Sequence, residues 1–111
     1  MRNRLVTHQV DAVFRALADP TRRAVLDRLR DCQEPAGLIA GASPVSRPAI
    51  SRHIRVLLRA NLVRERRRGR QRIYELNPRP LKAVDRWLDD YRVFWERKLA
   101  NLKTFIESEE M

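Results

Sequence analysis

Apolar residues recur at helical intervals through the first part of the chain. In residues 10–18 they fall three or four positions apart, and a second stripe of the same kind runs through residues 19–30. This spacing predicts two amphipathic helices. Asp19 is suited to cap the second helix, because its side chain can accept a hydrogen bond from a free backbone N–H, and Pro20 fits the first helical turn. The chain therefore begins with two helices that each offer one apolar face to a core.

The middle of the chain passes from one helical pattern to another through a short break. Residues 31–35 predict a loop, and the apolar stretch 36–43 predicts a short helix although it contains two glycines. Ser46 is suited to cap a longer helix that runs to about Ala60. A short helix, a tight turn and a second helix are typical of the helix-turn-helix motif, here at about residues 36–60.

The last third of the chain first predicts strands and then one long helix. Residues 62–76 have β-branched and aromatic residues at both ends and Gly69 between them, which predicts a hairpin. Two prolines in residues 77–80 end this pattern. A long amphipathic helix follows at about residues 79–107. Its apolar positions step by threes and fours: Leu81, Val84, Leu88, Tyr91, Trp95, Leu99, Leu102 and Ile106.

Together these elements predict a mainly α protein with a small β-hairpin, organised as one winged helix-turn-helix domain over residues 1–111. The wing is the hairpin, which follows directly after the second helix of the motif. A chain of 111 residues with 43% hydrophobic composition can bury one core of modest size. The single cysteine, Cys32, excludes an intramolecular disulfide. No apolar run reaches the length of a membrane span or of a signal peptide, so a soluble cytoplasmic protein with no membrane partner is expected.

The positive charge of the chain is concentrated in its central segment. The formal net charge is +10. Residues 46–76 contain ten arginines and two glutamates, a net +8, whereas residues 1–45 contribute +2 and residues 77–111 contribute 0. A localised field of one sign attracts a polyanion, and solubility alone does not need such clustering.

A helix over residues 46–60 separates its apolar residues from its arginines. At about 100° per residue, Ile50, Ile54 and Leu57 fall on one face, which must pack inward. The opposite, outward side carries Pro48, Arg52, Arg55 and Arg59, flanked by Ser51, with Arg47 at the N-terminus. This geometry suits a recognition helix in the major groove of double-stranded DNA, where arginine can bond guanine through two donors. A solvated helix face is the alternative, but residues 46–64 contain no acid that could pair with these arginines.

The predicted hairpin extends the cationic surface. Six arginines surround Gly69: Arg64, Arg66, Arg67, Arg68, Arg70 and Arg72. Such a wing suits the DNA backbone or the minor groove, and a flexible, merely soluble loop is the alternative. We expect Ile73 and Tyr74 to anchor the wing in the core, with base stacking by Tyr74 as the alternative. We expect His53 to pack or to bond to backbone, with DNA contact as the alternative. The predicted DNA-contact residues are Arg47, Pro48, Ser51, Arg52, Arg55, Arg59, Arg66, Arg67, Arg68 and Arg70.

Two segments of the chain resemble a known family. The sequences VFRALADPTRRAVLDRLR, residues 13–30, and SRPAISRHIRVLLRANLVRERRRGRQRIYEL, residues 46–76, are similar to those of the ArsR/SmtB family of winged helix-turn-helix transcriptional repressors. The sequence YRVFWERKL, residues 91–99, further resembles a subgroup with an aromatic-rich final helix. The resemblance covers about residues 10–105, which is nearly the whole chain.

The resemblance implies a symmetric homodimer that blocks transcription by covering an operator. In the family, the residues that match Arg47, Pro48, Ser51 and Arg52 tend to face the DNA. The dimer is implied to form through the first and last helices, and the apolar stripe on the last helix is longer than one compact domain needs. The predicted interface residues are Val10, Val13, Phe14, Leu88, Tyr91, Trp95, Leu99 and Leu102.

The chain departs from the metal-sensing members of the family. Many of them bind metal through a Cys-x-Cys pair before the recognition helix, and those positions are Pro35 and Gly37 here. Others use histidine and aspartate on the last helix, but residues 77–111 contain no histidine. Without nitrogen or sulfur ligands, a transition-metal site is poorly supported. The sequence therefore predicts a non-metal-sensing member with no metal and no cofactor, and it leaves the effector unknown.

These features distinguish three classes of function. A dimeric, sequence-specific DNA-binding repressor agrees with all of them. A sequence-nonspecific architectural DNA-binding protein is the alternative, because charge alone can hold DNA. An enzyme is not expected, since the sequence has no glycine-rich phosphate loop, no Ser/His/Asp arrangement and no metal cluster.

Overall fold

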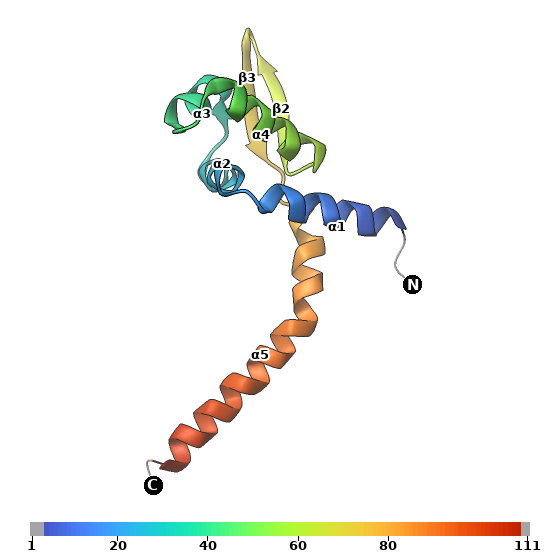
Figure 1. Ribbon diagram of the computed structural model, residues 1–111, viewed down its shortest axis with the longest axis vertical. Helices are drawn as coiled ribbons and strands as arrows, with labels where there is room; N and C mark the ends of the chain where they lie inside the picture. The colour runs from blue at the N-terminus through green and yellow to red at the C-terminus, as the bar shows by residue number, and fades with distance from the viewer. Residues whose placement is uncertain (1–3, 110–111) are drawn as a thin grey trace. The chain divides into compact units, whose positions relative to one another are not determined.

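The computed structural model describes the backbone of residues 4–109 and the side chains of residues 8–109. Over this range the predicted order of helices and hairpin is confirmed (Figure 1). The chain divides after Leu81 into two units, and each is described by itself. The elements are α1 Arg4–Leu17, α2 Pro20–Asp31, β1 Glu34–Pro35, α3 Ala36–Ala42, α4 Arg47–Arg59, β2 Val63–Arg68, β3 Gln71–Leu76 and α5 Leu81–Glu109.

The core of the first unit forms around the inward face of α4. Ile50, Ile54 and Leu57 are at most 5% exposed, as their spacing predicts. Around them pack the buried apolar side chains of α1, α2, α3 and the hairpin, which are Val13, Ala16, Val25, Leu26, Leu29, Ile39, Leu62, Val63, Ile73 and Tyr74. Because burial of apolar surface is the main favourable term in folding, this face fixes which side of α4 remains in solvent.

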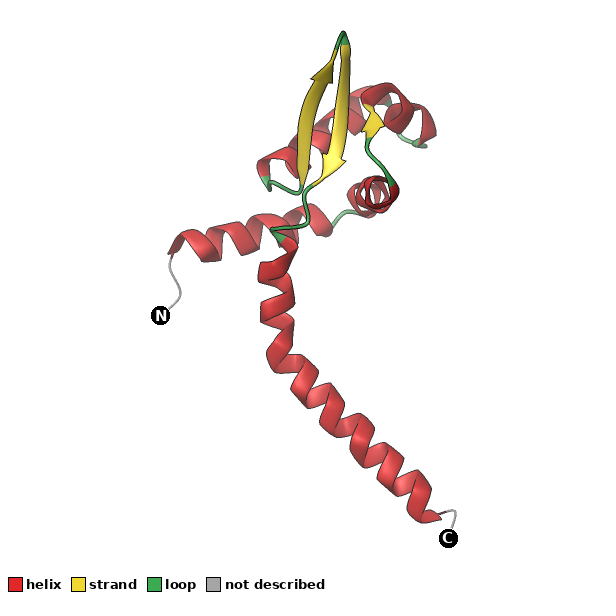
Figure 2. Cartoon of the chain, turned by 180° about the vertical axis from the view of Figure 1, so that it is seen from behind, coloured by secondary structure: helices red, strands yellow, loops and turns green. Residues whose placement is uncertain are grey.

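A short strand lies where the sequence predicts a loop. Residues 31–35 were expected to be loop, but Glu34 and Pro35 form β1 and pair with Tyr74 and Ile73 of β3. The sheet order is β1-β3-β2, so that β3 is central (Figure 2). Glu34 is nearly buried and its carboxylate forms an ion pair with Arg28 of α2. A strand of two residues is too short to show an alternation of apolar and polar positions in the sequence. This strand depends on β3 for its hydrogen bonds.

The hairpin of β2 and β3 turns at Gly69. Gly69 has a φ of 63°, a conformation that costs glycine little and that two-residue hairpin turns require. The register runs from Val63 opposite Leu76 to Arg68 opposite Gln71. Side chains alternate between the two faces of a strand. One face of the hairpin therefore carries Glu65, Arg67, Arg72 and Tyr74, and the other carries Arg64, Arg66, Arg68, Ile73 and Glu75.

The corner between α1 and α2 is held by Arg22. Asp19 caps α2 as predicted, because its carboxylate accepts a 3.1 Å hydrogen bond from the Arg22 backbone N–H. The Arg22 side chain turns back to α1, where Nε and Nη2 donate to the carbonyls of Ala16 and Arg15, each at 2.8 Å. The last carbonyls of a helix lack partners within the helix, so this guanidinium satisfies two of them. The corner thereby fixes the direction of both helices.

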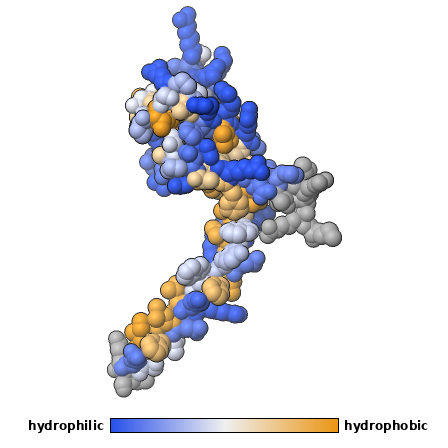
Figure 3. All heavy atoms as spheres, in the orientation of Figure 1, coloured by the Kyte–Doolittle hydropathy of each residue, from blue (hydrophilic) through white to orange (hydrophobic). Residues whose placement is uncertain are grey.

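The second unit is the long helix α5. It spans 29 residues, and two short ion pairs from Arg92 to Asp85 and Asp89 lie along its polar side. In the residues that the structure describes, α5 has no buried side chain. Its apolar surface is extensive (Figure 3). The exposed large apolar residues are Trp87, Leu88, Tyr91, Val93, Phe94, Trp95, Leu99, Leu102, Phe105 and Ile106.

We predict that Arg22→Lys destabilises the chain by about 1–2 kcal/mol, because lysine cannot reproduce the fork that bonds two carbonyls at once. For a domain of this size, that loss lowers the melting temperature by roughly 5–10 °C. Arg23→Lys is the matched control, since Arg23 is exposed and its Nη1 donates to the Leu17 carbonyl at 2.8 Å. Calorimetry of both variants checks this, and equal losses would contradict it.

Candidate nucleic-acid interface

The outward side of α4 carries the helix residues predicted to contact a ligand. Ser46 caps α4 as predicted, accepting a 3.3 Å hydrogen bond from the Ala49 backbone N–H. Pro48 lies in the first helical turn, where the missing N–H costs nothing. All six predicted residues of this segment are exposed: Arg47, Pro48, Ser51, Arg52, Arg55 and Arg59. The N-terminal backbone donors of α4 and these side chains therefore lie on one solvent-facing surface.

The arginines of α4 have no acidic partners. Within residues 8–109, no carboxylate lies within 4.0 Å of the guanidinium groups of Arg47, Arg52, Arg55 or Arg59. An ordinary surface helix mixes charges of both signs, and like charges one turn apart destabilise a helix. The unpaired arginines therefore cost stability in the free protein, and an external polyanion removes that cost.

The arginines of the wing fall into two groups. Arg66 forms an ion pair with Glu75 at 3.1 Å, and Arg72 forms one with Glu65 at 3.4 Å. The other wing arginines have no acidic partner among the described residues: Arg64, Arg67, Arg68 and Arg70. The predicted interface residue Arg66 thus has its charge balanced by Glu75. The charge of Arg64, which is not among the predicted interface residues, is not balanced.

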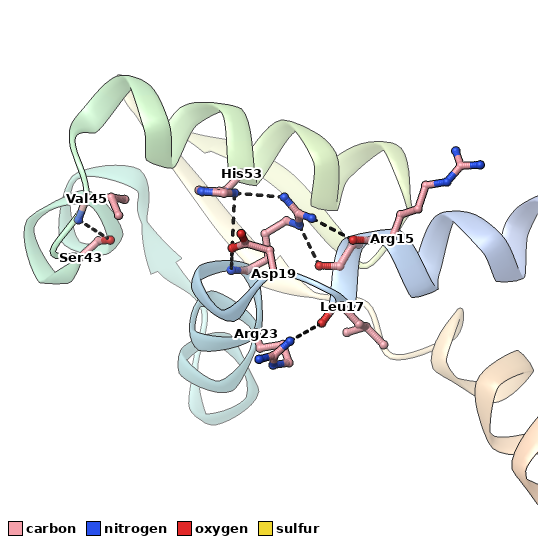
Figure 4. Close-up of polar contacts among 9 residues, drawn as sticks. Arg15, Leu17, Asp19, Arg23, Ser43, Val45 and His53 are labelled. Carbon is pink, nitrogen blue, oxygen red and sulfur yellow. Dashed lines mark hydrogen bonds and ion pairs between the residues drawn. The ribbon is translucent and has the colours of Figure 1, made fainter.

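His53 lies on the side of α4 that faces the α1–α2 corner (Figure 4). Its Nδ1 accepts a 3.2 Å hydrogen bond from Nη1 of Arg22 and lies 3.7 Å from the Asp19 carboxylate. The sequence predicted packing or a bond to backbone, and the partners are side chains. The Arg22 backbone N–H, which donates to the Asp19 carboxylate, holds the pKa of Asp19 below its usual value. The position of α4 is therefore tied to α2 by polar contacts as well as by the core.

A cavity of about 340 Å³ separates α4 from the helix-facing side of the wing. Its walls carry the charged groups Arg47, Arg55, Arg72 and Glu65, together with the hydroxyls of Ser51 and Tyr74. Its floor is apolar and consists of Ile50, Ile54, Leu58, Ala36, Gly37 and Ala40. Sequence reasoning missed this cavity, because it depends on how the hairpin packs across α4.

Tyr74 and Ile73 anchor the wing, as predicted. Both are 6% exposed, and they point to opposite faces of β3. Burial raises the pKa of the Tyr74 phenol above its usual value, and the Glu65 carboxylate raises it further, while Arg72 opposes the shift. Tyr74 lines the cavity, where its hydroxyl is in hydrogen-bonding contact with Glu65 and Arg72.

Possible metal ligands do not gather in the described part of the chain. No group of three or more His, Cys, Asp and Glu side chains there is arranged to hold a metal ion. Cys32 is exposed, and Pro35 belongs to β1 rather than to a ligand-bearing helix. None of the described helices is both long enough and apolar enough to cross a membrane.

The predicted dimer residues divide between core and surface. Val13 is 1% exposed within a single chain, so its side chain belongs to the core and has no surface to offer a partner. Phe14 is 37% exposed, and Val10 is half-buried. The α5 residues of the predicted set are all exposed: Leu88, Tyr91, Trp95, Leu99 and Leu102. Helical spacing alone cannot separate a core position from an interface position, and the dimer contacts stay a prediction.

The chain is similar in sequence to known regulators. A family described as a helix-turn-helix domain matches residues 17–66. The HTH-type transcriptional regulator Rv2034 of Mycobacterium tuberculosis is 43% identical over 99 residues, which cover 89% of this chain and 90% of that protein. The transcriptional repressor SdpR of Bacillus subtilis is 38% identical over 76 residues, which cover 68% of this chain and 84% of that protein.

Solved structures share the fold. The ArsR family transcriptional regulator RHA00566 superposes with a TM-score of 0.73 at 34% identity, covering 81% of this chain and 93% of that one. The homodimeric winged helix-turn-helix DNA-binding domain of Mb0332 from Mycobacterium bovis, a possible ArsR-family regulator, superposes with a TM-score of 0.64 at 25% identity. That match covers 91% of this chain and 93% of that one.

Proposed function

Because the chain belongs to the ArsR family of winged helix-turn-helix transcriptional regulators, we propose that it is a homodimeric repressor that binds an operator by sequence. It acts on double-stranded DNA in the cytoplasm and catalyses no reaction. The observation that carries the proposal is the outward side of α4, where four exposed arginines have no acidic partner in the described chain. A solvated surface does not require that arrangement, whereas a polyanionic ligand does.

In this proposal α4 lies in the major groove. The exposed Arg52 and Ser51 are within the first two turns of the helix, where recognition helices contact base edges. Arg52 is suited to donate two hydrogen bonds to guanine O6 and N7. Arg47 and the backbone N–H groups at the N-terminus of α4 are placed to bind phosphate, which positions the helix without reading sequence.

The unpaired wing arginines serve the DNA backbone. Arg67, Arg68 and Arg70 surround the turn at Gly69, at the far end of the hairpin from the core. A hairpin tip with no acidic partner is suited to a phosphate or a narrow minor groove. We therefore propose that these three arginines, the exposed α4 residues and Arg64 contact the DNA. Arg66, whose charge is balanced by Glu75, contributes less to DNA affinity.

The exposed side of α5 is the proposed dimer surface. An apolar stripe of this length exposed on a helix marks an interaction site, and a related domain forms a homodimer. A two-fold dimer places two recognition helices on two half-sites of one operator. The proposed contacts are Leu88, Tyr91, Trp95, Leu99 and Leu102, with Val10 and Phe14 of α1.

We predict that Arg52→Ala costs about 1–3 kcal/mol on the operator and relaxes the preference at one base position. Arg68→Ala should weaken operator and scrambled DNA by similar factors and lower the salt slope by about 1, because it removes a phosphate contact. The operator is first found by selecting bound sequences from random DNA. Titrations at several salt concentrations then check both variants.

The reverse pattern would overturn these roles. If Arg52→Ala weakens both DNAs equally while Arg68→Ala weakens the operator alone, the wing reads the sequence. If the wild-type protein binds operator and scrambled DNA equally, it is instead an architectural protein that recognises charge.

We also predict a dimer at micromolar concentration. Trp95→Glu combined with Leu99→Glu should yield monomer, because each buries a charge in the proposed interface. Arg97→Glu is the control, since it introduces the same charge on another side of α5. Sedimentation velocity measures the result. A wild-type chain that stays monomeric at high concentration contradicts the proposal.

Metal ions should not release this protein from DNA. Zn²⁺, Cd²⁺ and arsenite are the ions to test, in titrations of wild type and Cys32→Ser against the operator. The expected result is no specific shift in affinity and nearly equal affinities for the two proteins, since Pro35 and Gly37 offer no ligands at the usual positions. A tenfold shift by a stoichiometric metal, about 1.4 kcal/mol of coupling, would show a site that the sequence conceals.

A further inference from the structure

Glu65 is an acid placed inside the most basic part of the chain. Between residues 35 and 74 the sequence contains no other aspartate or glutamate. Glu65 lies opposite Tyr74 in the hairpin register, and one of its carboxylate oxygens lies 3.4 Å from Nε of Arg72. All three residues line the cavity between α4 and the wing. The ion pair is therefore part of the cavity wall and not of the outer face of the hairpin.

The charges around this cavity are out of balance. Arg47 and Arg55 enter the lining from α4 and Arg72 enters it from the wing, against the single carboxylate of Glu65. Three guanidinium groups and one carboxylate leave a net charge of +2 at the cavity wall. A net positive charge at one place on the surface attracts a further anion. A cavity of about 340 Å³ has room for a tetrahedral oxyanion.

The hydrogen-bond donors of the cavity suit a phosphate group. A guanidinium donates two parallel hydrogen bonds equally well to a carboxylate or to a phosphate. Ser51 on α4 and Tyr74 on the wing also line the cavity, and each adds a hydroxyl from its side. Phosphate carries more acceptor oxygens than a carboxylate, so it can engage donors from helix and wing together.

We propose that this cavity is a phosphate-binding site in which the Glu65 carboxylate occupies Arg72 until a phosphate group replaces it. The inference rests on the proposed function, because DNA then supplies that phosphate from its backbone. A free phosphate has the same chemistry, and the experiment separates the two sources. In the free protein Glu65 holds Arg72 in place and weakens nonspecific attraction to polyanions.

The opposite face of the hairpin supplies a matched control. Glu75 pairs with Arg66 at 3.1 Å, in the same two strands, but neither residue lines the cavity. Glu65→Gln and Glu75→Gln therefore change the net charge equally and free one arginine each. They differ in the face on which that arginine lies.

The first test measures DNA affinity at several salt concentrations. Glu65→Gln should bind operator and scrambled duplex about threefold more tightly near physiological salt and steepen the salt slope by about 1, because one more arginine becomes available to phosphate. The gain should disappear in the Arg72→Gln background, and Arg72→Gln alone should be weaker than wild type. Glu75→Gln should gain less than half as much. Circular dichroism confirms that each variant is folded.

The second test follows arginine Nε–Hε signals by NMR while inorganic phosphate replaces chloride at constant ionic strength. Signals of Arg55 and Arg72 should shift, and more strongly in Glu65→Gln than in Glu75→Gln. If millimolar phosphate also releases wild-type protein from DNA beyond the effect of chloride, free phosphate is a ligand. If it does not, while duplex DNA shifts the same signals, the backbone is the source.

Four results would overturn the site: no gain in Glu65→Gln, an equal gain in Glu75→Gln, a gain that survives in the Arg72→Gln background, or Arg72 signals that neither phosphate nor DNA moves. These leave the proposed function intact as long as the wild type binds duplex DNA. A wild type that binds no duplex DNA defeats the proposed function, and the inference with it.

Discussion

The guanidinium of Arg22 joins three helices at one point. The Arg22 side chain donates from Nε and Nη2 to carbonyls at the C-terminal end of α1, and its third nitrogen, Nη1, reaches His53 on α4. The Arg22 backbone N–H donates to the Asp19 cap of α2. Arginine can only donate hydrogen bonds, so Nδ1 of His53 is the acceptor in this contact. The direction in which α4 presents its outward residues therefore depends also on polar contacts that His53 makes with the α1–α2 corner.

The electrostatics of the first unit reflect a balance between folding and binding. The exposed arginines of α4 repel one another, and the apolar burial of Ile50, Ile54 and Leu57 must outweigh that repulsion. On the wing, Glu65 and Glu75 each balance one arginine, one on each face of the hairpin. The free chain thus limits its self-repulsion where the strands are paired, and leaves charge unbalanced near the tip and on α4.

Sequence patterns predicted the helices, both N-caps and the hairpin, because each is encoded by residues close together in the chain. Asp19 and Ser46 accept from backbone groups three residues away, and Gly69 sets the turn by its own conformation. Features that join distant segments were not predictable. The strand β1, the contact of His53 with Arg22 and the cavity beneath α4 all depend on how elements pack. The burial of Val13 within the single chain was not predictable either, since it depends on what covers α1.

The apolar surface of α5 needs a partner that a single chain does not provide. In isolation a helix gains little from its own hydrogen bonds, and most helices in proteins are stabilised by packing an apolar face. No side chain of α5 between Leu81 and Glu109 is buried in the single chain, yet Trp95, Leu99 and Phe105 expose more than half of their surface. The Arg92 ion pairs with Asp85 and Asp89 are exposed and contribute little. In the proposed homodimer, a second copy of the chain supplies these apolar contacts, and the two-fold axis places two recognition helices on two half-sites.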